Sequence, residues 1–247
     1  MSSNAVEHYD KHLGKFYAWM VGDFTGASKS MADYFDTIGL QPTSTGKAVD
    51  LGCGHGLQTI PLAKRGFAVM GIDTCAFLLE KLKANINELP IELLQANLLS
   101  FPKHIHSEVD AVVCMGDTIT HLDSIGDVKN LILSISESLS PGGSFCVSFR
   151  DYTQSELTGI SRFIPVKSDD SRIHTCFLEY DSTVIHVHDL LHTREQDGWS
   201  LSASSYDKLR LAPEVLKNLA HDNKLKLVSE ITIRGMNYYS FQKHIES

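Results

Sequence analysis

The sequence lacks an apolar run long enough to cross a bilayer, and it lacks any cluster of lysine and arginine. A membrane-spanning helix needs about 20 consecutive apolar residues. Proteins that grip nucleic acid by its phosphates usually present a basic surface, whereas this chain of 247 residues carries a net charge of −8. These absences argue against a membrane protein and against nucleic acid as a partner.

Cysteine is scarce and scattered. The five cysteines are odd in number, and no C-x-x-C pair suggests a zinc site. The first residues lack the basic and apolar segments of a secretory signal. We therefore expect reduced thiols and a cytoplasmic location.

Histidines cluster late in the chain. His186 and His188 share one face if the segment is a strand, and with Asp189 or His174 they could bind a metal. No third ligand stands at a diagnostic spacing, so we expect a polar sheet face and no metal. Whether these histidines or His192 contact a substrate stays open.

Apolar segments of strand and helix type alternate through the first two thirds of the chain. Strands are expected at 47–51, 67–73, 91–95, 109–115 and 144–149, with helices at 57–65, 75–89 and 124–139. Such alternation predicts an α/β fold with a parallel sheet and right-handed crossovers. Ligands of such sheets bind beyond the carboxyl ends of the strands.

The remaining segments differ from this pattern. Residues 1–46 look helical and are expected to form a lid over the α/β core, residues 47–152. Residues 153–211 are rich in β-branched and aromatic side chains and predict a small antiparallel cap. Residues 212–247 predict a helix opened by proline and two strands that complete the core.

The stretch Lys47–Gly56 reads K-A-V-D-L-G-C-G-H-G, a short apolar strand followed by glycines at alternate positions. A dinucleotide fingerprint would place its third glycine one residue later. An acid, Asp50, also precedes the loop, which suits a cationic ligand better than a pyrophosphate. A second strand ends at Asp73, about 20 residues on, where ribose hydroxyls are usually bound.

The form D-x-G-x-G-x-G resembles motif I of class I S-adenosylmethionine (SAM) methyltransferases. The segments V-D-A-V-V-C-M-G-D-T-I-T-H-L-D at 109–123 and L-S-P-G-G-S-F-C-V-S-F-R-D-Y at 139–152 are similar to the glycine N-methyltransferase branch. The resemblance covers roughly residues 7–155. It implies a Rossmann-like fold with a seven-stranded, mostly parallel sheet, and SAM as cofactor with S-adenosylhomocysteine (SAH) as product.

The resemblance also implies roles for individual residues. The cofactor would be held by the glycine loop and by residues at the ends of the next strands: Asp50, Gly52, Cys53, Gly54, Gly56, Asp73, Thr74, Asn97, Leu98 and Met115. Tyr9 would cover the sulfonium, Arg150 would face the acceptor, and His121 would lie beside both. Asp117 stands where the branch has asparagine, so glycine is not carried over as the substrate.

Methyl transfer needs a neutral nucleophile, so His121 or Asp117 is a candidate base. A salt bridge for Arg150 and a structural histidine at 121 are equally open alternatives. We expect a methyltransferase acting on an amine or amino-acid-like small molecule, as a monomer or homodimer. A protein or RNA methyltransferase, or a SAM-binding protein without activity, are the alternatives.

Overall fold

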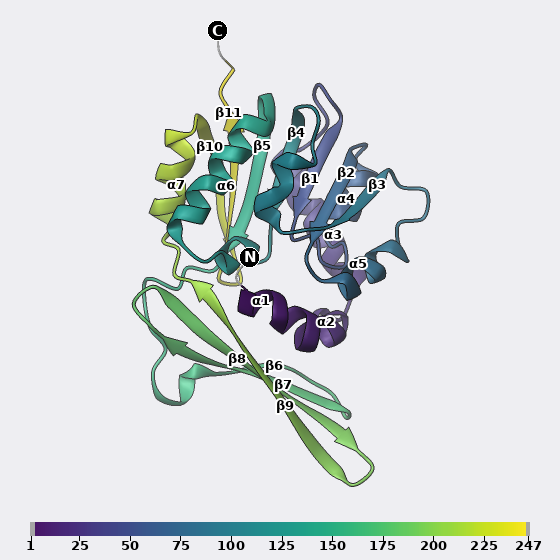
Figure 1. Ribbon diagram of the computed structural model, residues 1–247, viewed down its shortest axis with the longest axis vertical. Coiled ribbons are helices and arrows are strands. Elements are labelled where there is room, and N and C mark those ends of the chain that lie inside the picture. Colours follow the sequence, from purple (N-terminus) through teal and green to yellow (C-terminus); the bar gives the residue numbers. More distant parts are fainter. Residues whose placement is uncertain (1–2, 246–247) are drawn as a thin grey trace.

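The computed structural model describes residues 3–245 and contains two β-sheets with helices between them (Figure 1). The larger sheet, with helices on both faces, forms an α/β body. The smaller, antiparallel sheet lies beyond the N-terminal helices. The candidate site lies among the strand ends of the larger sheet, these helices and the second sheet.

The larger sheet has the strand order β10-β11-β5-β4-β1-β2-β3. Only the pairs that involve β11 are antiparallel. The strands are β1 (Lys47–Leu51), β2 (Ala68–Asp73), β3 (Ile91–Gln95), β4 (Val109–Cys114), β5 (Leu139–Phe149), β10 (Leu225–Ile233) and β11 (Met236–Lys243). This arrangement confirms the predicted seven-stranded, mostly parallel sheet.

Alternating side chains of the central strands feed two separate cores. On one face α3 (Phe24–Thr37) and α4 (Thr59–Lys64) pack over the sheet. On the other face α6 (Ile125–Ser138) and α7 (Pro213–Asp222) do so. The strands between are therefore buried on both sides, as in other parallel sheets.

Two boundaries differ from the sequence expectation. Helix α5 (Ala76–Lys83) ends six residues before the predicted end, and residue Asn87 has a left-handed φ of 50°. Strand β5 begins at Leu139, five residues before the predicted start at 144, so residues 141–143 are part of the strand. Strand β5 pairs with β4 at Leu139 and again from Ser144. The proline and the two glycines between these positions form an irregularity in the pairing.

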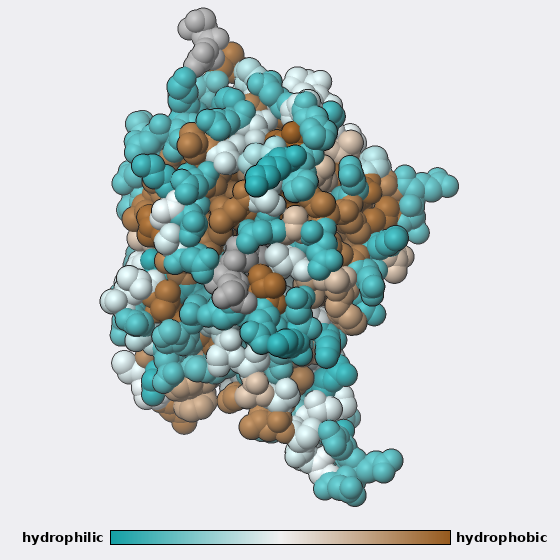
Figure 2. Space-filling view, in the orientation of Figure 1, coloured by the Kyte–Doolittle hydropathy of each residue, from teal (hydrophilic) through white to brown (hydrophobic). Residues whose placement is uncertain are grey.

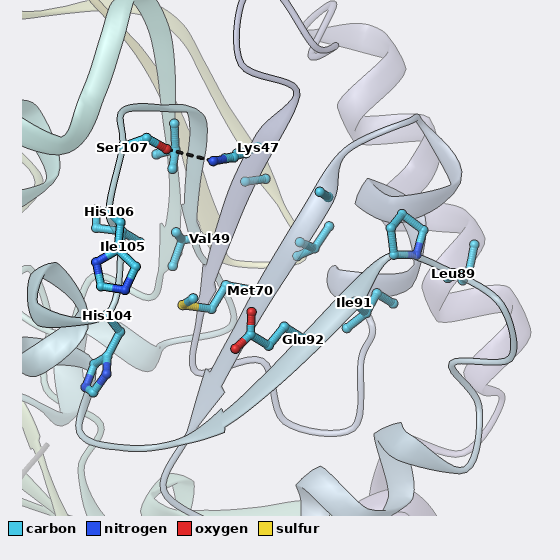
Figure 3. A pocket seen from close by; sticks show the side chains of 15 residues that line it. Lys47, Val49, Met70, Leu89, Ile91, Glu92, His104, Ile105, His106 and Ser107 are labelled. Atoms are coloured by element: carbon cyan, nitrogen blue, oxygen red, sulfur yellow. Dashed lines mark hydrogen bonds between the residues drawn. The ribbon is translucent and has the colours of Figure 1, made fainter.

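The connection between β3 and β4 is short and holds only a 3-10 helix, η2 (Leu98–Lys103). It leaves a groove of about 570 Å³ where β1, β2 and β3 begin (Figure 3). Val49, Met70 and His104 are among its lining residues. The groove lies at the opposite end of the strands from the glycine loop, so we do not assign it to the site.

The loop before β1 is fixed by one buried carboxylate. Asp110 on β4 accepts hydrogen bonds from the backbone N–H groups of Thr43, Ser44, Thr45 and Gly46. These bonds outweigh the cost of burial and hold the pKa of Asp110 far below its usual value.

The second sheet has the order β6-β7-β8-β9 and is antiparallel throughout. Its strands are β6 (Phe163–Ser168), β7 (Arg172–Tyr180), β8 (Val184–Glu195) and β9 (Gly198–Leu209). This sheet confirms the predicted small antiparallel cap, in which β6 has the weakest sequence signal. Strand β6 is a mostly exposed edge strand with a proline, so it lacks the apolar alternation of a half-buried strand.

The N-terminal segment runs through α1 (Ser3–His8), a π-helical turn η1 (Tyr9–Leu13) and α2 (Gly14–Val21). It packs between the two sheets (Figure 1). The His8 Nδ1 atom lies 2.8 Å from the Ser204 hydroxyl of β9. The Asn4 amide donates to Asp207 on the same strand. Hydrogen bonds thus fasten this segment to the antiparallel sheet.

Polar side chains cover most of the face in Figure 2, with apolar patches among them. Among residues 3–245, no helix has the length and apolar character needed to cross a membrane.

Candidate active site

The carboxyl ends of β1, β2 and β4 meet at one cavity, which we call the cofactor cavity. The loop Gly52–Gln58 forms one wall, and Asp73 and Met115 form others. Helical residues Tyr9 and Tyr17 cover it. The cavity lies where ligands of parallel α/β sheets bind.

Gly52 permits the tight turn at the end of β1. Its φ is +74°, and a Cβ atom here would lie 2.4 Å from Cγ2 of Thr118. For both reasons, a larger side chain at this position would require the loop to shift. The backbone can therefore approach a ligand closely. Gly56 differs, because its Cβ would meet Leu82 of α5, so this glycine serves helix packing.

Two buried acids stabilise the loop. Asp73, at the end of β2, accepts hydrogen bonds from the backbone of Gly54 and Cys75, while burial raises its pKa. Asp50 accepts a hydrogen bond of 2.6 Å from the Thr59 hydroxyl, and burial raises its pKa to about 7. The second oxygen of Asp50, Oδ1, is buried without a hydrogen-bond partner among the described residues.

Five predicted cofactor residues do not line this cavity. They are Asp50, Gly56, Thr74, Asn97 and Leu98. The Asp50 carboxylate lies beneath the glycine loop, and Leu98 is buried in the core of the α/β body. The exposed Asn97 caps η2 by accepting from the N–H of Leu99. Gly52, Cys53, Gly54, Asp73 and Met115 do line it.

A larger cavity of about 760 Å³ lies next to the first, and we call it the acceptor cavity. The N-terminal helices, the end of β5 and the antiparallel sheet enclose it. Four residues line both cavities: Tyr9, Tyr17, Gly116 and His121. The two spaces therefore meet at these residues, and two of them, Tyr9 and His121, were predicted.

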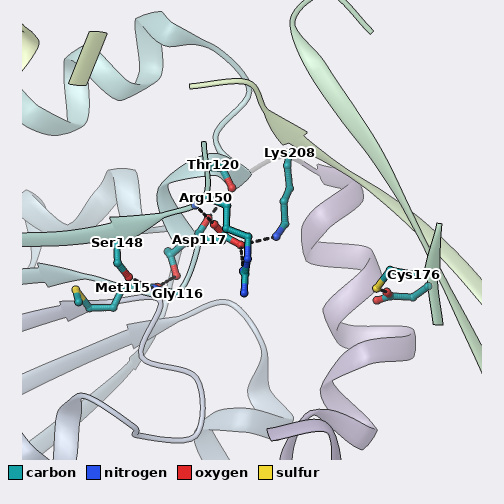
Figure 4. Close-up of polar contacts among 10 residues, drawn as sticks. Met115, Gly116, Asp117, Thr120, Ser148, Arg150, Cys176 and Lys208 are labelled. Carbon is teal, nitrogen blue, oxygen red and sulfur yellow. Dashed lines mark hydrogen bonds and ion pairs between the residues drawn. The ribbon is translucent and has the colours of Figure 1, made fainter. Parts of the chain in front are cut away.

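A three-residue ionic cluster lies in the acceptor cavity (Figure 4). Asp117 is buried and has a left-handed φ of 71°. Its Oδ2 atom accepts from Arg150 Nη1 at 2.7 Å and from Lys208 Nζ at 2.8 Å. Its Oδ1 atom accepts from the Arg150 backbone N–H at 2.7 Å.

This geometry removes Asp117 from the candidate bases. Burial alone would raise its pKa, but Lys208 and Arg150 hold the pKa well below its usual range. An ionised carboxylate that already accepts three hydrogen bonds has little tendency to take a proton. Asp117 therefore holds the two cations in place, and of the two open alternatives for Arg150 the salt bridge is present.

His121 is buried, and burial lowers its pKa to about 3, with a further contribution from Lys208. Its imidazole is therefore neutral near pH 7, and its Nδ1 atom has no hydrogen-bond partner among the described residues. The Tyr9 ring meets it edge-on, with 5.7 Å between the centroids. A neutral imidazole, with one donor and one acceptor nitrogen, thus stands at the junction of the cavities.

Sequence reasoning missed several residues of the site. Lys208 was missed because it lies on β9, 91 residues after Asp117. Thr118 lies in the segment 109–123, but only the position of its side chain against Gly52 shows that it shapes the loop. His55 and Gln58 line the cofactor cavity, and their place in or directly after the glycine loop could have predicted this.

The alternative of a metal site that joins His186 and His188 to Asp189 or His174 does not fit the geometry. The side chains of His186 and His188 pair with Asp207 and Glu179 on one face of the antiparallel sheet. Asp189 belongs to the other face, because neighbouring residues of a strand point in opposite directions. It contacts His174 at 3.0 Å there.

Known proteins resemble the chain in both sequence and fold. Residues 48–143 match the protein family described as a methyltransferase domain. Glycine N-methyltransferase of Mus musculus is 28% identical over 183 residues, which cover 67% of this chain and 62% of the mouse enzyme. Glycine/sarcosine N-methyltransferase of Halorhodospira halochloris is 26% identical over 132 residues, covering 53% of this chain and 49% of that protein.

The solved structure of the CcbJ methyltransferase from Streptomyces caelestis has a TM-score of 0.78 and 18% identity. That match covers 96% of this chain and 98% of the other. The chain spans less than two thirds of the length of the two curated relatives above. Together the comparisons confirm the predicted class I methyltransferase fold and the likeness to the glycine N-methyltransferase branch.

Proposed function

We propose that the chain, whose residues 48–143 match a methyltransferase domain, transfers the methyl group of SAM to a nitrogen of a small acceptor. The observation that carries the proposal is the junction of two cavities at Tyr9, Tyr17, Gly116 and His121. One cavity adjoins the glycine loop and the other adjoins a cationic cluster. A methyl group has to pass between two bound molecules, and this junction provides the place.

The cofactor cavity suits SAM. Gly52 and Gly54 would lie against its amino-acid end, and Asp73 would take the ribose hydroxyls. The unpartnered Oδ1 of Asp50 lies behind the loop, and a cationic ligand would favour the ionised form of this carboxyl group. When bound, SAM supplies an electrophilic methyl group on a sulfonium leaving group.

Arg150 and Lys208 favour an acceptor that carries a carboxylate. Asp117 balances only one of their two charges. The Arg150 side chain is 46% exposed and uses one terminal nitrogen, Nη1, for Asp117. Its other guanidinium N–H groups remain to bind an anion, and guanidinium suits a carboxylate geometrically. Relatives named for glycine and sarcosine N-methylation support this choice.

The residues at the junction would align the acceptor and exclude water. His121, being neutral, would accept a hydrogen bond from an amine N–H and direct the nitrogen lone pair at the methyl group. It is too weak a base to remove a proton from an ammonium ion, so the amine has to arrive unprotonated. The helices α1 and α2, with Tyr9 and Tyr17, would form a lid over the cofactor.

Calorimetric titration with SAM, SAH and NADH tests the cofactor. We expect micromolar binding of SAM and SAH and none of NADH, and the absence of SAM binding would overturn the proposal. A panel of primary and secondary amines, each with and without a carboxylate, then tests the acceptor. Methyl transfer should favour the carboxylated members.

Arg150→Gln tests the carboxylate contact, with Arg194→Gln as a control because Arg194 is exposed on β8 outside the cavity. Loss of a charged hydrogen bond of this kind costs about 1.5–3 kcal/mol, so the acceptor KM should rise at least about tenfold. SAM affinity should stay within about twofold of the unmodified chain. An unchanged KM would mean that Arg150 only serves Asp117.

A further inference from the structure

At the antiparallel end of the acceptor cavity, four metal-binding side chains converge from three elements. His174 and Cys176 lie on β7, Asp189 lies on β8, and His8 ends α1. Cys176 and Asp189 are register partners. Figure 4 shows Cys176 on its strand beside the N-terminal helix. The methyl-transfer proposal uses none of the four.

The ligand atoms are close enough to share one ion. Each of His174, Cys176 and Asp189 offers one donor atom, and these atoms lie within 4.8 Å of one another. Cys176 Sγ is 3.8 Å from His174 Nε2. Tetrahedral zinc with ordinary bond lengths separates a sulfur and a nitrogen ligand by roughly 3.6 Å. The two contacts to Asp189 are shorter than in a zinc site: the Cys176 Sγ contact of 2.8 Å would have to lengthen by roughly 0.7 Å and the His174 Nε2 contact of 3.0 Å by roughly 0.4 Å.

His8 adjoins Asp189 and is a candidate fourth ligand, outside the three-residue group whose donor atoms all lie within 4.8 Å of one another. Its Nε2 atom is buried 3.0 Å from Asp189 Oδ2, yet the geometry is not that of a hydrogen bond. Two ligands of one ion meet in this way, because their lone pairs point at the ion rather than at each other. The other ring nitrogen of His8 lies 2.8 Å from the Ser204 hydroxyl. Metal-binding histidines usually have such a second partner, which fixes the ring.

Charge favours a divalent cation at this point. Asp189 is 1% exposed, and its ion-pair partners among the described residues are two histidines. A buried carboxylate needs compensation. A divalent ion with the Asp189 carboxylate and the Cys176 thiolate sums to zero charge. On binding, the thiol would release its proton to water.

From this convergence we propose that His8, His174, Cys176 and Asp189 bind a zinc ion that ties α1 to the antiparallel sheet. Two imidazoles, one thiolate and one carboxylate form a donor set suited to zinc. In the sequence, His174 and Asp189 were candidate ligands only together with His186 and His188, because no diagnostic spacing links the four residues proposed now. Zinc binding at this site would require neither SAM nor the acceptor.

The test uses the full chain without a polyhistidine tag, stripped with a chelator and then incubated with Zn²⁺ alone. After gel filtration, elemental analysis should find about one zinc ion per chain. Co²⁺ in place of zinc should give visible bands of tetrahedral coordination and a near-ultraviolet thiolate band. Zn²⁺ should also raise the midpoint of thermal unfolding.

Cys176→Ser should abolish the thiolate band and weaken Zn²⁺ binding by more than about tenfold. Loss of a residue that only supports a ligand already lowers metal affinity by about tenfold, so loss of a ligand should cost more. His188→Ala, on the opposite face of the same sheet, should bind Zn²⁺ like the unmodified chain. Circular dichroism checks that each variant is folded. If Cys176→Ser does not fold, His8→Ala replaces it in the test, because it removes the proposed ligand on α1. A chain that binds no zinc or cobalt after stripping would overturn the proposal, as would equal binding by Cys176→Ser and His188→Ala.

Discussion

Lys208 and Asp117 are 91 residues apart in the sequence, and their charged atoms lie 2.8 Å apart in the acceptor cavity. Lys208 belongs to the antiparallel sheet, and Asp117 follows β4 of the α/β body. The side chains of both are at least nine-tenths buried. The ion pair therefore joins the two sheets at the candidate site.

Asp117→Asn should destabilise the chain by about 3 kcal/mol, because it leaves two cations without their buried carboxylate. Asparagine tolerates the left-handed φ at this position, so the change isolates the charge. Urea unfolding measures the loss. Asp33→Asn breaks an exposed pair with Lys29 and should cost less than about 1 kcal/mol. Equal losses in the two variants would contradict the structural role of Asp117.

Asp110→Asn should lower the free energy of unfolding at pH 7 by about 2–3 kcal/mol, since four backbone donors lose an ionised acceptor. The folded-state pKa of Asp110 is depressed. Its contribution is therefore complete above the unfolded pKa of about 3.9 and declines as the pH falls below it.

Unfolding by urea at several pH values between 7 and 3 measures this dependence. The difference between the unmodified chain and Asp110→Asn should shrink below pH 4. Glu108→Gln, at an exposed position two residues earlier, should change little at any pH. A difference that stays constant into acid would show that the charge of Asp110 is not what stabilises the loop.

Gly52→Ala should weaken SAM binding at least about tenfold, because the added methyl group meets Thr118 and favours another φ. Calorimetric titration gives the affinity. Gly39→Ala is the matched control: Gly39 also has a positive φ, but open space surrounds it outside both cavities. If both substitutions weakened SAM binding alike, general loss of stability would explain the result.

Tyr9→Phe should lower kcat more than it lowers SAM affinity, since the Tyr9 side chain lies where the two cavities meet. The ring and its packing are retained, so only hydroxyl contacts to bound molecules are lost. Tyr34→Phe is the comparison, because the Tyr34 hydroxyl is buried in another core without a hydrogen-bond partner among the described residues. Initial rates at saturating SAM distinguish the two. Equal rates in both variants would remove Tyr9 from the reaction.

The pH dependence of kcat/KM should follow the acceptor amine and show no break near pH 6.5. The pKa of His121 is lowered to about 3 by burial, so its imidazole stays neutral throughout the neutral range. Activity should rise with pH as more acceptor loses its proton. His121→Asn should lower the rate without changing the shape of the profile. A limb between pH 6 and 7 that disappears in His121→Asn would show that His121 is a base after all.

The α/β body could be predicted because its signals are local. The apolar strand, the glycines at alternate positions and Asp73 lie within 27 residues of one another, from 47 to 73, and each follows from short-range geometry. Tyr9 and His121 were predicted from the resemblance, and the structure brings them together. Asp50 was assigned to the ligand, but its depth beneath the loop depends on packing with Thr59.

The antiparallel sheet carries site residues that could not be predicted from the sequence. Cys176 and Asp189 are partners only because the β7–β8 hairpin has one particular register, and a shift of one residue would reverse their faces. His8 reaches them from another part of the chain. No spacing rule links positions that tertiary packing brings together.

The hydrogen bonds between the N-terminal segment and β9 also constrain the order of assembly. His8 and Ser204 are 196 residues apart, and His12 and Ser202 are 190 apart. During synthesis, α1 emerges long before the strand it fastens to, and contacts over such separations form late in folding. The glycine loop and strands β1 to β5 precede β9 in the chain and can fold earlier, from more local contacts. A nascent chain would therefore hold an open cofactor cavity first and close it only when β9 is in place.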